Sequence, residues 1–105
     1  MSFVIVINTC PDQKSARTIA ENLVEANLAA CVNIMPAGVS VYRWQGKIET
    51  ETEHLLLIKT REDHYSKVET MIQKLHPYEL PEIIAVPITS GSPEYLGWLS
   101  QNINH

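Results

Sequence analysis

Two side chains in the C-terminal third of the sequence have the chemistry of metal ligands. His76 offers an imidazole nitrogen, which suits copper and zinc, and Glu82 offers a charged carboxylate oxygen. Pro77 and Pro81 lie between them and restrict the backbone. Six residues of extended chain span roughly 18 Å at ~3.1 Å each, so the two groups meet only if the segment folds back or if they face each other across a subunit boundary. The competing interpretation is that this segment fixes a corner between a helix and a strand.

The elements on either side of this segment determine where it lies. Apolar residues at helical spacing predict a helix from Glu62 to Leu75, and the prolines that follow prevent its continuation. The apolar run from Ile83 to Ile88 predicts a strand, and Pro87 places this strand at a sheet edge because proline cannot donate to a neighbouring strand. The segment is therefore expected to connect a helix to an edge strand. His64, near the start of the helix, is expected to be solvated.

The rest of the sequence alternates between strand and helix patterns. The unbroken apolar run from Phe3 to Ile7 is typical of a strand that is covered on both faces. We expect strands at 3–7, 30–44 with a bend near 36–38, 47–59 and 83–88, and helices at 12–27, 62–75 and from 92 onward. This order predicts a single α+β domain over residues 1–105. It has the ferredoxin-like β-α-β-β-α-β sandwich arrangement, with a long β-hairpin and a short C-terminal helix.

The strand from Lys47 to Lys59 is unusually long. Its 13 residues reach about 40 Å at ~3.3 Å each, whereas a domain of this size is roughly 35 Å across. Together with the preceding strand, across a turn at Gln45-Gly46, it should form a projecting hairpin with exposed apolar surface and unpaired edges. Association with a second copy would cover both. The alternative is two shorter strands that are broken near Glu53 and need no partner.

An acidic ladder occupies one face of this strand, where Glu49, Glu51 and Glu53 alternate with other residues. We interpret it as a solvated face whose charges oppose unwanted edge pairing. The alternative is that such ladders attract cations in an oligomer. Trp44, at the hairpin tip, is expected at a subunit contact.

Charge and composition limit the function classes. The formal net charge is -4, and the eight lysine and arginine residues are scattered, so neither nucleic acid nor membrane is an expected partner. No apolar run approaches the ~20 residues of a membrane span, and no secretory signal is recognised, which predicts a cytoplasmic location. The two cysteines are then expected as free thiols. No Ser/His/Asp set, nucleophile elbow or phosphate loop is visible, so an enzyme is not expected.

Five segments together resemble one known family. They are Leu28-Ala29-Ala30-Cys31-Val32-Asn33, Tyr42-Arg43-Trp44-Gln45-Gly46-Lys47, Leu57-Ile58-Lys59-Thr60, His76-Pro77-Tyr78-Glu79-Leu80-Pro81-Glu82-Ile83 and Tyr95-Leu96-Gly97-Trp98-Leu99. In this order and spacing the chain resembles the CutA family of divalent-cation tolerance proteins over nearly its whole length. The resemblance implies a ferredoxin-like fold, a tight homotrimer similar in shape to PII signalling proteins, and an association with copper and other divalent metal ions. It implies no catalytic activity.

The sequence departs from the family at two positions that bear on metal binding. Some members carry a copper-linked cysteine where this chain has Asn8, and some carry a second histidine where it has Leu75. We therefore expect weak to moderate binding of copper or another divalent cation at His76 and Glu82. Cys10 joins them only if the following turn directs its thiol into the same cleft.

Two functions follow from these expectations. The first is a trimeric binding protein whose inter-subunit clefts take divalent metal ions or a small ligand. The alternative is a structural or regulatory PII-like trimer that acts through partner proteins without a specific metal site.

Overall fold

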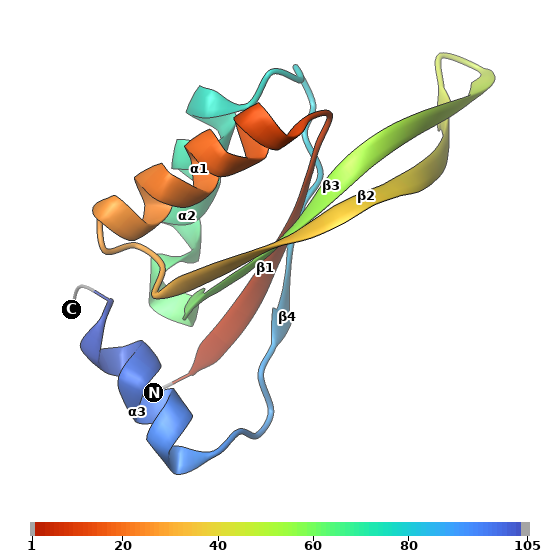
Figure 1. Ribbon diagram of the computed structural model, residues 1–105. Helices are drawn as coiled ribbons and strands as arrows, with labels where there is room; N and C mark the ends of the chain where they lie inside the picture. The colour runs from red at the N-terminus through yellow and green to blue at the C-terminus, as the bar shows by residue number, and fades with distance from the viewer. Residues whose placement is uncertain (1, 104–105) are drawn as a thin grey trace.

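The fold is a four-stranded antiparallel sheet with two helices on one face and a third helix at one end (Figure 1). The computed structural model describes residues 2–103. In chain order the elements are β1 (Phe3–Cys10), α1 (Gln13–Glu25), β2 (Cys31–Trp44), β3 (Lys47–Arg61), a 3-10 turn (Glu62–His64), α2 (Tyr65–Leu75), β4 (Ile83–Pro87) and α3 (Pro93–Gln101). The strand order β2-β3-β1-β4 places Pro87 in an edge strand. The predicted ferredoxin-like α+β fold and the edge position of the last strand are confirmed.

The helical layer buries the apolar stripe of α1 against the sheet. Ile19 and Leu23 are fully buried and belong to the same core as Val6, Leu56 and Ile58. The start of α1 is capped by Asp12, whose carboxylate accepts a hydrogen bond from the Ser15 backbone N–H at 2.7 Å. The core beneath α1 is thus formed by the two central strands, β1 and β3.

The hairpin of β2 and β3 projects beyond the helical layer, as predicted (Figure 1). It stretches the molecule to 45 × 25 × 23 Å. Gln45 and Gly46, with φ of 51° and 81°, form the tight turn at its tip, a left-handed backbone that glycine adopts without steric cost. The interruption lies in β2, where the register shifts between Met35 and Gly38. Because β3 is continuous through Glu53, the alternative of two shorter strands is wrong.

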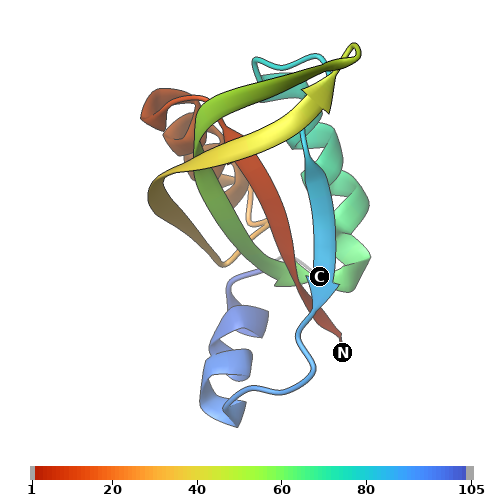
Figure 2. The same ribbon diagram turned by 90° about the vertical axis from the view of Figure 1, so that its right-hand side faces the viewer.

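One face of the sheet is covered by α1 and α2, and the opposite face is not (Figure 2). Strand alternation places Val4 and Val6 in the core and turns Ile5 and Ile7 outward. The cross-strand register extends the outward set into a continuous apolar surface, here called the open sheet face: Ile5, Ile7, Met35, Leu55, Leu57, Ile84 and Val86. The apolar run in β1 predicted cover on both faces, and this chain provides it on one.

The prediction that His64 is solvated is wrong. The 3-10 turn between β3 and α2 folds its ring inward, and the side chain is buried with Nδ1 2.9 Å from an Asp63 carboxylate oxygen.

No helix within residues 2–103 is long and apolar enough to cross a membrane.

Candidate functional site

A cavity of about 900 Å³ lies along the projecting hairpin, between Glu53 near its base and Trp44 near its tip. The hairpin forms one wall, the end of β1 contributes Thr9, and the segment between α2 and β4 forms the other wall. We call this cavity the hairpin cleft; its lining residues are Thr9, Ser40, Val41, Tyr42, Trp44, Glu53, Pro77, Tyr78, Glu79, Leu80, Pro81 and Glu82.

His76 ends α2 and anchors the segment that follows. Its side chain is buried, and both ring nitrogens are engaged by the backbone. Nε2 lies 2.7 Å from the Thr9 carbonyl oxygen, and Nδ1 accepts a hydrogen bond from the Tyr78 N–H at 3.0 Å. A carbonyl can only accept and an N–H can only donate, so these partners select the neutral tautomer protonated at Nε2. His76 thereby joins the end of β1 to the start of the cleft wall and leaves no lone pair for a metal ion in this arrangement.

Cys10 is fully buried and takes part in a polar network behind the cleft wall. Its thiol donates to the Asn8 side-chain oxygen at 3.4 Å, and the Asn8 amide donates to the Glu82 backbone carbonyl at 2.8 Å. Burial raises the pKa of the Cys10 thiol to about 11. Because thiolate, not thiol, is the metal ligand, this environment opposes metal binding by Cys10 at neutral pH. Asn8 instead holds Glu82 by its backbone.

Glu82 is exposed and lines the cleft, as does Glu79. His76 and Cys10 do not line it. Within residues 2–103, no group of three or more His, Cys, Asp or Glu side chains is placed to hold a metal ion. The predicted ligand set is therefore not assembled by a single chain, and its completion across a subunit boundary stays a prediction.

The sequence interpretation missed the pairing of Glu53 with Tyr78. Glu53 is only 9% exposed, and its Oε2 accepts a hydrogen bond from the Tyr78 hydroxyl at 3.1 Å. Burial, and then the neighbouring Glu53 carboxylate, raise the pKa of Tyr78 far above its usual value. The interpretation of the acidic ladder as wholly solvated is thus wrong at Glu53. Its burial could have been predicted from its position, because Glu53 lies where the alternating half of β3 meets the half that is apolar on both faces.

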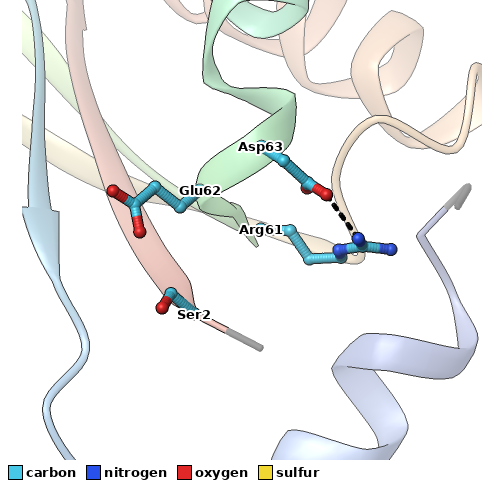
Figure 3. A pocket seen from close by; sticks show the side chains of 4 residues that line it. All are labelled: Ser2, Arg61, Glu62 and Asp63. Carbon is cyan, nitrogen blue, oxygen red and sulfur yellow. Dashed lines mark hydrogen bonds and ion pairs between the residues drawn. The ribbon is translucent and has the colours of Figure 1, made fainter.

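A second hollow lies near the N-terminal end of β1 and is lined by Ser2, Arg61, Glu62 and Asp63 (Figure 3). The Arg61 guanidinium forms an ion pair with Asp63, and Glu62 points away from both. The cation in this hollow is already neutralised, so the hairpin cleft is the better candidate site.

The fold and the cleft define a class of protein: a ferredoxin-like α+β sandwich with an overlong hairpin and a glutamate-lined cleft along it. Residues 4–102 match the family model described as CutA1 divalent ion tolerance protein. The chain is 50% identical over 98 residues to the Divalent-cation tolerance protein CutA of Thermus thermophilus, which covers 93% of this chain and 95% of that protein. It therefore belongs to the CutA1 family of divalent ion tolerance proteins, which confirms the resemblance found in its sequence motifs.

Two further relatives agree with this assignment. The Protein CutA homolog of Xenopus laevis is 48% identical over 91 residues, which cover 87% of this chain and 60% of that longer protein. The crystal structure of CutA from Xylella fastidiosa superposes with a TM-score of 0.95 at 49% identity, covering 99% of this chain and 100% of that chain. The likeness extends over the whole fold, including the hairpin.

Proposed function

We propose that this protein is a cytoplasmic homotrimer that binds divalent cations at its subunit boundaries, in a binding rather than a catalytic role. The observation that supports the assembly most strongly is the open sheet face. Ile84, Met35 and Val86 are substantially exposed there, beside the outward side chains of the two central strands. A contiguous apolar surface of this kind is rare on a monomer.

The energetics favour covering this face. Fully burying an aliphatic side chain stabilises by about 1.5–3 kcal/mol, so covering the exposed half of Ile84 or Val86 contributes about 1 kcal/mol each. The hairpin offers a second uncovered surface through Val39, Val41 and Ile48, which are all exposed. Two different uncovered surfaces suit a head-to-tail contact, and the trimer is the smallest ring that such contacts close.

A pair of valines tests the assembly. Val86 on β4 is 40% exposed and Val24 on α1 is 42% exposed, so the two are matched in type and exposure in the single chain. We expect Val86→Asp to dissociate the trimer because it places an unpaired charge in an apolar interface. Val24→Asp, on the helical face, should leave the mass unchanged. Equal behaviour of the two variants in light scattering would contradict the proposed interface.

For the divalent cation, we propose His76, Glu82 and Cys10 as ligands; of these, Glu82 lines the hairpin cleft in the single chain. A second subunit at the boundary would supply the further oxygen or nitrogen ligands that a metal ion requires. His76 joins only by exchanging its hydrogen bond from Tyr78, and Cys10 only by losing its proton. Both costs predict weak to moderate affinity. The names of the relatives, which refer to divalent-cation tolerance, support this choice of ligand.

The metal proposal is tested by calorimetric titration of the metal-free protein with copper and with zinc. Glu82→Gln should weaken binding, whereas Glu25→Gln, an exposed glutamate on α1, should not. If the intact trimer binds neither metal, the alternative function is favoured: a structural or regulatory trimer that acts through partner proteins.

A further inference from the structure

The hairpin cleft combines carboxylates with aromatic and apolar walls. Its lining includes three glutamates, and no lysine or arginine of the described chain lines it. Glu79 and Glu82 are exposed, whereas Glu53 is buried. A cavity lined by one sign of charge with low-dielectric walls concentrates the opposite charge. The cleft therefore selects for cations.

Glu53 is the unusual member of this set. It is nine-tenths buried, yet within residues 2–103 no lysine, arginine or histidine nitrogen forms an ion pair with it. Its single hydrogen bond, from Tyr78 to Oε2, leaves the carboxylate charge without a counterion from the described chain. Buried charges in proteins are ordinarily paired, because desolvation of an isolated carboxylate is costly. A bound cation would supply the missing charge.

The walls around Glu53 indicate which kind of cation fits. Tyr42 and Tyr78 line the cleft, and aromatic faces attract ammonium groups as well as apolar bodies. Pro77, Pro81 and Leu80 add apolar surface that cannot ligate a metal ion. A divalent ion prefers several converging oxygen or nitrogen ligands, and the described chain gathers no such group. The volume of about 900 Å³ also falls in the range of small-molecule sites and greatly exceeds that of one ion.

We propose that the hairpin cleft binds a small primary ammonium compound with an aromatic or apolar body. The ammonium group donates hydrogen bonds to the Glu53 carboxylate, and the body packs against the aromatic and proline walls. The exposed carboxylates at the mouth attract the cation from solution. The groups that carry the proposal, Glu53, Tyr42 and Tyr78, come from one chain. Val41 and Trp44, which also line the cleft, belong to the surface assigned to the subunit contact, and the proposal does not use them.

Three probes of similar shape and different charge test the proposal on the unmodified protein. They are 2-phenylethylammonium, 2-phenylethanol and phenylacetate, titrated calorimetrically in the presence of EDTA so that no metal contributes. We expect the ammonium probe to bind at least about tenfold more tightly than the alcohol, because a hydrogen bond to a charged group contributes more than one to a neutral group. Phenylacetate should not bind. Equal binding of the ammonium and the alcohol, or no binding of the ammonium probe, would overturn the proposal.

Two variants locate the charge that is responsible. Glu53→Gln keeps the size of the side chain and an oxygen that accepts from Tyr78, and it should weaken binding of 2-phenylethylammonium at least about tenfold. Glu51→Gln is the matched control: it removes the same charge from the same face of β3, but Glu51 is exposed and does not line the cleft. Its effect should stay within about twofold because exposed charges are screened. Equal losses in both variants would show that only the general acidity of the hairpin matters and would overturn the role given to Glu53.

Discussion

The two hydrogen bonds of His76 predict that this residue stabilises the fold rather than serving as a free ligand. His76→Ala removes the contacts to the Thr9 carbonyl and the Tyr78 N–H, at 2.7 and 3.0 Å. Each intramolecular hydrogen bond contributes about 1 kcal/mol net, and a buried polar group left without a partner costs about 1–3 kcal/mol. Allowing for partial relaxation around the vacated site, we expect His76→Ala to lower the free energy of unfolding by about 2–4 kcal/mol.

The assay is urea unfolding of the original protein and the variant at one fixed protein concentration, because assembly couples stability to concentration. His54→Ala is the control, since the Nδ1 atom of His54 makes no hydrogen bond in the described structure. It should cost clearly less than His76→Ala. A parallel copper titration separates the two roles of His76. If stability is unchanged and copper binding is lost, His76 is a free ligand and the reasoning from its hydrogen bonds is refuted.

Two further predictions concern Cys10 and Trp44. Burial raises the pKa of Cys10 from 9.0 to about 11, so the folded chain keeps a proton that the unfolded chain releases. The protonated thiol contributes fully to the free energy of unfolding below pH 9, and this contribution, up to about 2–3 kcal/mol, is lost as pH rises to 11. Cys10→Ala should therefore reduce the fall of the free energy of unfolding between pH 9 and 11, measured by urea unfolding. An unchanged fall would contradict the raised pKa of Cys10. Trp44→Ala should weaken assembly by about 2 kcal/mol, the usual cost of truncating a central interface aromatic. Unchanged mass on dilution together with an unchanged melting temperature would place Trp44 outside the interface.

The arrangement of the elements was predictable from local patterns. The change from period 2 to helical spacing located α1 and α2, Pro87 located the sheet edge, and the length of β3 required a projecting hairpin. Each of these signals is contained in a short stretch of sequence, because it depends on backbone geometry and on which faces are apolar.

The contacts across the cleft were not predictable in the same way. Alternation shows that Glu53 shares a face with Glu49 and Glu51. Only Glu53 is covered, however, and the residue that contacts it, Tyr78, lies 25 residues further along the chain. Likewise, the sequence marks His76 as a nitrogen ligand and contains no signal that Thr9 occupies one of its nitrogens. Such pairings depend on how a connecting segment folds back onto the sheet, which no periodicity encodes.

The mass of the unmodified protein in dilute solution tests the central claim most directly. The open sheet face and the projecting hairpin predict a trimer, with a mass of three times 11.8 kDa by light scattering over a wide dilution series. A mass of 11.8 kDa that does not change with concentration would contradict the account, because the apolar sheet face would then be stable without a partner.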